Sequence, residues 1–330
     1  MTVRILVTGA NGFIGSALCP RLEESGFLVR GAVRAQANLP LGYIKESKRR
    51  QWVRLHDQST EDETNQALRD VNVVLHLAAR VHVMTDRAPD PFQEFRQVNL
   101  VWTKQLARAA ASQGIRRFVY LSSIKVNGEQ SVRPITERDL PKPQDPYGVS
   151  KWEAEQALAQ VSVETGIETV VVRSPLVYGP SVKGNFLQLL KILQRGVPLP
   201  LATVHNRRSL VSRGNLIDAL LCCVRDKRAA GQTYLISDGE DLSTPELIRR
   251  LSKAMGVKAR LWPFPIPLLR WMGQLIGERA AIDRLLGSLQ VDSSKIRREL
   301  DWNPPFSIDR GLVETAAWFR GQSPVSTATS

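Results

Sequence analysis

Short apolar runs alternate with helical patterns along the first half of the chain. The apolar runs cover residues 3–7, 28–33, 71–77, 117–121 and 168–172, and each has the length of a buried strand. Stretches with helical spacing lie between them, beginning with residues 16–22. This βαβ rhythm predicts an α/β fold with a doubly wound parallel sheet.

The rhythm breaks after Pro175. Proline-rich connections at 197–200 and 262–267 separate helical stretches there, which predicts a smaller, mainly helical lobe. We expect this lobe to lie over the carboxyl ends of the strands, where ligands bind in open α/β sheets. The predicted organisation is a nucleotide-binding domain at 1–175, a substrate lobe at 176–322 that is partly interleaved with it, and a disordered tail at 323–330.

The turn after the first apolar run contains three glycines with the spacing G-x-x-G-x-x-G. Gly9 permits the tight turn, Gly12 lets the main chain approach a pyrophosphate, and Gly15 allows close packing of helix on strand. This pattern predicts a dinucleotide site, although an ordinary strand-turn-helix can also carry three glycines. The expected cofactor contacts in this turn are Gly9, Asn11, Gly12, Phe13, Ile14 and Gly15.

The end of the second apolar run carries Arg34, at the position where NAD enzymes usually have an Asp or Glu for the adenine ribose. A guanidinium would pair with a 2′-phosphate, so this residue favours NADP(H) over NAD(H). The alternative is that Arg34 is a surface arginine and that specificity lies elsewhere. Further along, Asp57 could contact the adenine edge.

The remaining cofactor positions follow the fourth strand. Leu77, Ala78 and Ala79 are small or apolar, as a wall beside a bound cofactor requires. Asn99, on the following helix, could brace the backbone of the active site, although a single helical Asn is more often solvated.

Acid-base chemistry is indicated by the segment YGVSK. Pro146 predicts a helix start, so Tyr147 and Lys151 lie four residues apart on one helical face. The Lys151 ammonium could then stabilise the phenolate of Tyr147 and also bind a cofactor ribose. Ser123, at the end of a predicted strand, could hydrogen-bond the reacting oxygen. The combination with the glycine turn is specific, whereas Y-x-x-x-K alone is common by chance.

Composition limits the partners. The 330 residues include 45 Lys and Arg against 32 Asp and Glu, a formal net charge of +13, which suits a phosphorylated substrate, a nucleic acid or an anionic membrane surface. No recognisable nucleic-acid module accompanies this charge, so no nucleic-acid partner is expected. Cys19, Cys222 and Cys223 lack metal-ligand spacing, so we predict no metal site and a reducing, cytoplasmic location.

Over roughly residues 1–315, the chain resembles the extended short-chain dehydrogenases/reductases of the nucleotide-sugar epimerase/dehydratase group. The resemblance rests on TGANGFIG, HLAA, Asn99, SSIKVNG, YGVSK and RSPLVYGP. It implies a Rossmann domain that binds NAD(P), a catalytic set of Ser123, Tyr147 and Lys151, and a position near the nicotinamide for Pro175. It also implies that Asn185 and Arg208 contact the nucleotide diphosphate of a UDP-sugar. Arg207 is a rival for Arg208, and Arg284 is the nearest candidate for a further nucleotide-binding arginine.

The loop after Ser123 narrows the reaction. Nucleotide-sugar 4,6-dehydratases of this group carry an Asp-Glu pair there and decarboxylating members carry a Glu, whereas this chain has Ile124 and Lys125. A 4-keto-sugar reductase and a 4-epimerase therefore remain. Because a reductase tends to use NADPH, Arg34 favours the reductase. The segments SSIKVNG and YGVSKWEAE also resemble the quinovosamine-type reductases and epimerase-like proteins of bacterial surface-polysaccharide pathways, which implies a UDP-4-keto-6-deoxy-N-acetylhexosamine 4-reductase. The alternatives are a UDP-glucose or UDP-N-acetylglucosamine 4-epimerase, which could act on a lipid-linked sugar, and a non-catalytic nucleotide-binding regulator.

Two kinds of assembly are left open. Helices at 102–111 and 150–159 commonly form a dimer contact in enzymes of the group, so the resemblance implies a homodimer. The stretch 261–276 is rich in Trp, Phe, Leu and Ile and flanked by arginines, so it could lie on a membrane. We favour the alternative that it covers the substrate lobe.

Overall fold

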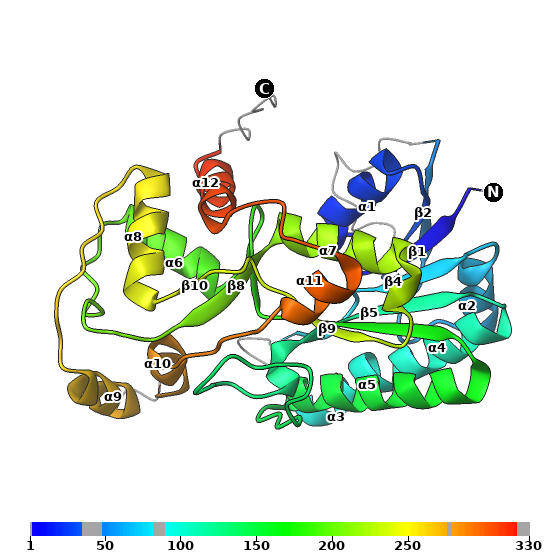
Figure 1. Cartoon of the computed structure of the whole chain (residues 1–330), viewed down its shortest axis with the longest axis horizontal. Helices are drawn as coiled ribbons and strands as arrows, with labels where there is room; N and C mark the ends of the chain where they lie inside the picture. The colour runs from blue at the N-terminus through cyan, green and yellow to red at the C-terminus, as the bar shows by residue number, and fades with distance from the viewer. Residues whose placement is uncertain (1, 35–47, 82–89, 276–278, 322–330) are drawn as a thin grey trace.

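A seven-stranded parallel sheet forms the centre of the molecule (Figure 1). The computed structural model describes residues 2–34, 48–81, 90–275 and 279–321, so the tail expected at 323–330 lies outside the described residues. The strand order is β3-β2-β1-β4-β5-β6-β9, and every neighbouring pair is parallel. The predicted doubly wound α/β sheet is thereby confirmed. The strands are β1 Arg4–Thr8, β2 Leu28–Val33, β3 Arg50–Arg54, β4 Val73–His76, β5 Arg117–Ser123, β6 Glu168–Ser174 and β9 Thr233–Leu235.

Helices cover both faces of this sheet, which explains why its strands are apolar at nearly every position. Successive side chains of β1 alternate between two cores: Ile5 and Val7 belong to one, and Leu6 belongs to the other. The first core is covered by α1 Gly15–Glu24, α7 Arg213–Arg225 and α11 Ser294–Leu300, and the second by α2 Glu61–Leu68, α4 Trp102–Ser112 and α5 Pro146–Thr165.

A smaller lobe with its own core follows β6. It contains a three-stranded sheet in the order β10-β8-β7, in which β8 runs parallel to β7 and antiparallel to β10. The chain leaves this lobe to form α7 and β9 and then returns to it, so the two layers are interleaved in sequence. The elements of the lobe are β7 Leu176–Tyr178, α6 Gly184–Gln194, β8 Arg208–Ser212, β10 Asp241–Leu242, α8 Thr244–Met255, α9 Ile266–Leu275, α10 Arg279–Leu286 and α12 Ile308–Phe319.

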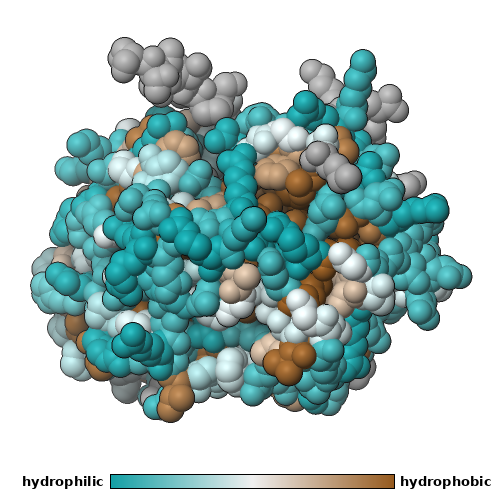
Figure 2. Space-filling model, turned by 45° about the vertical axis from the view of Figure 1, so that its right-hand side comes forward, coloured by the Kyte–Doolittle hydropathy of each residue, from teal (hydrophilic) through white to brown (hydrophobic). Residues whose placement is uncertain are grey.

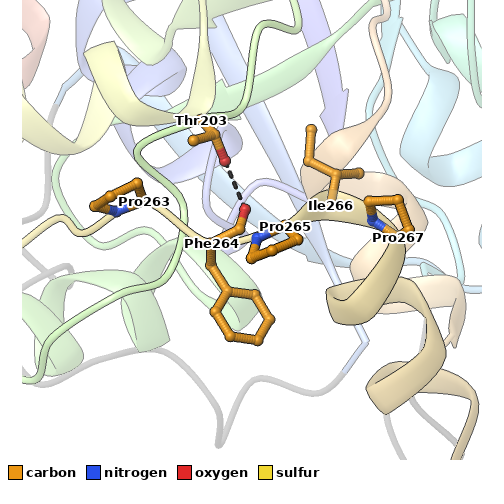
Figure 3. Close-up of a pocket in the computed structure, with 6 residues that line it drawn as sticks. All are labelled: Thr203, Pro263, Phe264, Pro265, Ile266 and Pro267. Carbon is orange, nitrogen blue, oxygen red and sulfur yellow. Dashed lines mark hydrogen bonds between the residues drawn. The ribbon is translucent and has the colours of Figure 1, made fainter.

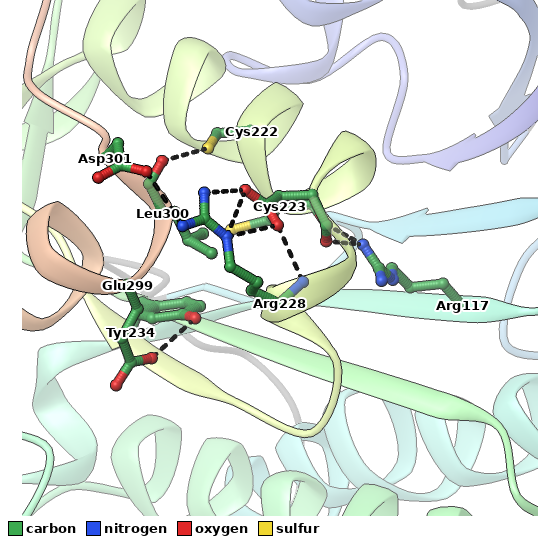
Figure 4. A network of polar contacts seen from close by, with 9 residues as sticks. Arg117, Cys222, Cys223, Arg228, Tyr234, Glu299, Leu300 and Asp301 are labelled. Atoms are coloured by element: carbon green, nitrogen blue, oxygen red, sulfur yellow. Dashed lines mark hydrogen bonds and ion pairs between the residues drawn. The ribbon is translucent and has the colours of Figure 1, made fainter.

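Polar contacts tie the C-terminal segment to the large sheet (Figure 4). Arg117 of β5 is fully buried, and its Nη1 donates to the carbonyls of Cys223 (2.7 Å) and Asp226 (2.6 Å), where α7 ends. These contacts satisfy carbonyls that the helix itself leaves without partners. Around them, Arg228 pairs with Asp301, Tyr234 with Glu299, and the Cys222 thiol with the Leu300 carbonyl. All three cysteines are free.

The surface in Figure 2 is mostly hydrophilic, with hydrophobic side chains gathered in one hollowed stretch of the face shown. This agrees with a sequence that contains 45 Lys and Arg and 32 Asp and Glu. Among the described residues, no helix is both long and apolar enough to cross a bilayer.

Candidate active site

The glycine turn between β1 and α1 packs closely on itself and on the main chain after β4. Gly9 has a φ of +66°, and a Cβ there would stand 3.0 Å from the Ala78 nitrogen. A Cβ on Gly15 would overlap the Gly9 carbonyl oxygen. Ile14, the N-cap of α1, makes no side-chain cap hydrogen bond, and the positive end of the helix dipole lies at this turn. These features fit a dinucleotide pyrophosphate.

The wall expected at 77–79 lies beside this turn because Thr8 holds it there. The Thr8 hydroxyl accepts from the nitrogens of Leu77 and Ala78, both at 3.1 Å, and meets His76 Nδ1 at 2.8 Å. His76 is fully buried, and burial lowers its pKa to about 3, so the ring is neutral. Sequence reasoning missed both Thr8 and His76, since each reads as the last residue of a strand.

Asn99 braces the loop after β4 against the helix that carries the catalytic candidates. Its side chain accepts from the Arg80 nitrogen (2.8 Å) and donates to the Arg80 carbonyl (3.0 Å) and to Ser150 Oγ (3.0 Å). Asn99 lies in a π-helical turn, Gln97–Val101, between α3 Pro91–Arg96 and α4. Insertion of one such turn is a frequent feature of functional sites. The geometry agrees with the bracing that we expected.

Tyr147 and Lys151 lie one turn apart near the start of α5, as their spacing predicted. Asp145 caps this helix by accepting from the Gly148 nitrogen at 2.7 Å, and Pro146 is its first residue. Lys151 is buried, with its Nζ donating to the Leu121 carbonyl of β5 at 2.9 Å. The same atom lies 5.9 Å from the centroid of the Tyr147 ring. The helix and β5 therefore bring the two side chains next to Ser123.

The ionisation of this set differs from the sequence-based expectation. Burial raises the pKa of Tyr147 to about 12, and a hydrogen bond with Ser123 offsets only part of that rise. Burial also lowers the pKa of Lys151 to about 7, against an opposing contribution from Glu155. The Lys151 ammonium lies closer to the Tyr120 ring, at 4.4 Å, than to Tyr147. Burial, with a smaller contribution from the Asp145 carboxylate, thus keeps Tyr147 a protonated phenol at neutral pH.

A buried cluster, which consists of Ser122, Asn127, Glu155 and Arg173, lies behind the catalytic candidates. Arg173 Nη2 and Glu155 Oε2 are 2.5 Å apart, and Glu155 also accepts from Ser122 Oγ. Arg173 Nη1 donates to Asn127 Oδ1 at 3.0 Å. Sequence reasoning missed this cluster, although the spacing of Glu155 four residues after Lys151 could have indicated it.

A second group of charges, the rim cluster of Lys125, Glu129 and Asp145, lies in front of the same helix. Lys125 Nζ is 2.5 Å from Asp145 Oδ2 and 2.7 Å from Glu129 Oε1. The two carboxylates raise the pKa of Lys125 and outweigh the effect of its burial. Dehydratases of the group have an acid after the catalytic hydroxyl. Here Lys125 occupies that position, and Glu129 and Asp145 are its anionic partners.

The expected substrate residues come from the smaller lobe, and two of them lie together. Arg208 Nη1 donates to the carbonyls of Arg284 (2.8 Å) and Gly287 (3.0 Å), and burial lowers the pKa of Arg208. Its rival Arg207 is exposed, which favours Arg208 for an inward role. Asn185 is exposed in the first turn of α6.

The three other predicted cofactor positions follow the carboxyl ends of strands of the large sheet. Arg34 is exposed directly after β2, and Asp57 is partly buried after β3. Pro175 is buried between β6 and β7. Within the described part of the chain, no group of three or more His, Cys, Asp or Glu side chains is arranged to hold a metal ion.

A family model described as the NAD dependent epimerase/dehydratase family matches residues 5–237. The chain belongs to this family. It is 38% identical over 323 residues to the UDP-glucose 4-epimerase of Vibrio cholerae, with 97% of this chain and 96% of that protein covered. It is 23% identical to the N-acetyl-alpha-D-glucosaminyl-diphospho-ditrans,octacis-undecaprenol 4-epimerase of Escherichia coli O157:H7, with 96% and 95% covered.

A solved structure agrees with this assignment. The chain matches UDP-glucuronic acid 4-epimerase from Bacillus cereus, in complex with UDP-glucuronic acid and NAD, with a TM-score of 0.80 and 27% identity. The match covers 97% of this chain and 99% of the other. The chain is thus a member of a family of NAD-dependent enzymes. The preference for NADP and the reductase reaction expected from Arg34 are not confirmed.

Proposed function

We propose that this family member is a UDP-sugar 4-epimerase that acts on UDP-glucose or UDP-N-acetylglucosamine with bound NAD. The observation that carries the proposal is a single acid-base centre, formed by Tyr147 and Ser123 beside Lys151, with Lys125 in the position of the dehydratase acid. The 38% identity to a UDP-glucose 4-epimerase supports the same reaction.

The residues of this centre would handle the proton at the sugar O4. When bound at the glycine turn, NAD would accept a hydride from C4 and later return it. In the oxidising half, the phenolate form of Tyr147 would take the O4 proton as the C4–H bond breaks, leaving a 4-keto sugar. After the sugar turns, Tyr147 would return a proton to O4 as the C4–H bond re-forms on the other face. Hydride and proton both return, so the cycle is redox-neutral.

The electrostatics indicate what Lys151 contributes to this cycle. Because the pKa of Tyr147 is raised to about 12, the phenol would have to lose its proton before it could accept one from O4, and nearby positive charge would stabilise that phenolate. Lys151 has a pKa of about 7, so it can supply that charge at neutral pH and lose it at higher pH. Ser123 would hydrogen-bond O4 and Tyr147 together.

Among the described residues around this centre, we find no free acid and base that would serve a dehydration. Removal of the C5 proton with loss of water at C6 would need a further acid and base. The carboxylates of the described loop and helix are engaged elsewhere, Glu129 and Asp145 with Lys125 and Glu155 with Arg173. This arrangement supports chemistry that is confined to C4.

Arg208 and Arg284 are the proposed contacts of the UDP diphosphate, with Asn185 as a further amide donor. Asn99, Arg34, Asp57 and Pro175 remain proposals for the cofactor side. We also infer a cytoplasmic homodimer that associates through α4 and α5, by analogy with the family.

A 4-keto-sugar reductase is the second candidate because Arg34 follows β2 at the ribose position. One pair of assays separates the two. Purified protein would be incubated with UDP-N-acetylglucosamine or UDP-glucose without added nicotinamide, and the product configuration would be read by NMR. The epimerase proposal predicts the C4 epimer and release of NAD on denaturation. Consumption of NADPH with a UDP-4-keto-6-deoxy-N-acetylhexosamine, without epimer formation, would instead establish the reductase.

A further inference from the structure

Helix α9 presents apolar side chains on two sides. Ile266 and Leu269 pack against the core of the smaller lobe. Leu268, Trp271 and Leu275 recur at intervals of three and four residues, so they share another face, and they are 42%, 57% and 66% exposed. A surface helix needs only one apolar stripe to hold it in place. The second one requires a different explanation.

The approach to α9 continues this apolar surface. A hollow there is lined by Thr203, Ile266 and the run Pro263, Phe264, Pro265 and Pro267 (Figure 3). Figure 3 shows the Thr203 hydroxyl turned onto the Phe264 carbonyl, to which it donates at 2.7 Å. The hollow therefore presents mainly carbon to the outside. Trp262, directly before it, is 44% exposed. We call Trp262, Leu268, Trp271 and Leu275 the α9 face.

The segment that forms the α9 face carries only positive charges. Residues 256–275 contain Lys258, Arg260 and Arg270 and no Asp or Glu. All three cations are exposed, and Arg270 has an anionic partner at 3.7 Å, Asp283 of the neighbouring α10. Trp side chains beside basic residues favour the boundary between water and lipid, because the ring has an apolar body and a polar N–H.

We propose that the α9 face binds the surface of an anionic lipid bilayer. Such a surface accepts the apolar side chains between its headgroups and attracts Lys258, Arg260 and Arg270. A two-fold contact with a second copy would instead bring the same basic residues together, at an electrostatic cost. The net charge of +13 also favours an anionic partner.

Docking in this way would bring the proposed diphosphate site close to the bilayer. Helix α10 packs on α9 and carries Arg284, whose carbonyl accepts from Arg208. This consequence rests on the proposed function, whereas membrane binding itself does not. The binding experiment therefore uses no substrate, and its failure would leave the epimerase proposal intact.

The test is flotation of the purified full-length protein with vesicles of phosphatidylcholine alone or of phosphatidylcholine with phosphatidylglycerol. We expect binding to the anionic vesicles only, and weaker binding as salt is raised. Leu275→Glu and Trp271→Glu should each reduce binding at least about tenfold, because each removes a large inserted side chain. Leu140→Glu is the matched control: this leucine is 77% exposed and outside the α9 face, so its variant should float like the unchanged protein.

Three results would overturn the proposal. The first is absence of flotation with anionic vesicles, and the second is equal flotation of the Leu275→Glu and Leu140→Glu variants. The third is a dimer, measured by light scattering, that dissociates in the Trp271→Glu variant without any vesicle binding by the unchanged protein. That result would assign the α9 face to a second copy. Circular dichroism of each variant verifies that it is folded.

Discussion

The buried cluster and the rim cluster both hold the first turns of α5, but water reaches them to different extents. The side chains of Glu155 and Arg173 are 5% and 6% exposed, whereas those of Lys125 and Asp145 are both 24% exposed. Each cluster contains a cation and a carboxylate in direct contact. Similar ion pairs can therefore have different roles. Burial determines how much free energy of unfolding is lost when one partner of the pair is removed.

The two clusters influence different members of the catalytic set. Glu155, in the buried cluster, raises the pKa of Lys151 against the effect of burial. Asp145, in the rim cluster, adds to the rise in the pKa of Tyr147, and it also fixes the loop after Ser123 to the cap of α5, since it contacts both Lys125 and the Gly148 nitrogen. We therefore expect removal of the Glu155 charge to alter pH dependence through Lys151, and removal of Lys125 to alter mainly the local position of the loop.

The largest expected effect comes from Arg173→Met. This change leaves the Glu155 carboxylate buried without its cation, at a cost of about 3–5 kcal/mol in the free energy of unfolding. Urea unfolding measures it. Arg108→Met is the matched control, because Arg108 pairs with Glu164 at 2.8 Å on the surface, where water screens the pair, and its loss should change the free energy of unfolding far less. Equal losses in both variants would contradict the distinction between buried and exposed pairs.

An intermediate effect is expected from Glu155→Gln. Glu155 raises the pKa of Lys151, so removing its charge lowers that pKa further below the present value of about 7. Activity that needs the Lys151 ammonium is lost as pH rises through this pKa. The alkaline limb of kcat/KM should therefore move to lower pH, by roughly one unit.

The control for this shift is Glu153→Gln, on the same helix. Glu153 pairs with Arg96 at 2.9 Å in a partly exposed position, and its variant should keep the original pH profile. An unchanged alkaline limb in the Glu155→Gln variant would show that Glu155 is purely structural.

The smallest expected effect is that of Lys125→Met. The partly exposed contacts of Lys125 should contribute about 1 kcal/mol or less to stability, since Asp145 keeps its capping bond to Gly148. Thermal unfolding measures this change. A loss as large as that of Arg173→Met would mean that the rim cluster carries the fold of α5.

The sequence predicted those features of the sheet and of the candidate site that depend on residues close together in the chain. Strands buried on both faces give continuous apolar runs, and the Tyr147–Lys151 pair depends only on helical spacing. The small sheet was missed because its strands β7 and β10 are too short to show a period. The Glu155–Arg173 pair was missed because it joins α5 to β6 through tertiary packing. The pKa values of Tyr147 and Lys151 also depend on burial, which the spacing of residues along the sequence does not reveal.

The most direct test of the proposed chemistry is NMR of the product formed from UDP-glucose or UDP-N-acetylglucosamine in D₂O. Hydride removal and return at C4, with Tyr147 handling only the oxygen-bound proton, predicts a C4 epimer that carries no deuterium on carbon. Tyr147→Phe should abolish product formation while retaining NAD. Deuterium at C5, loss of the C6 oxygen, or full activity of the Tyr147→Phe variant would contradict the account.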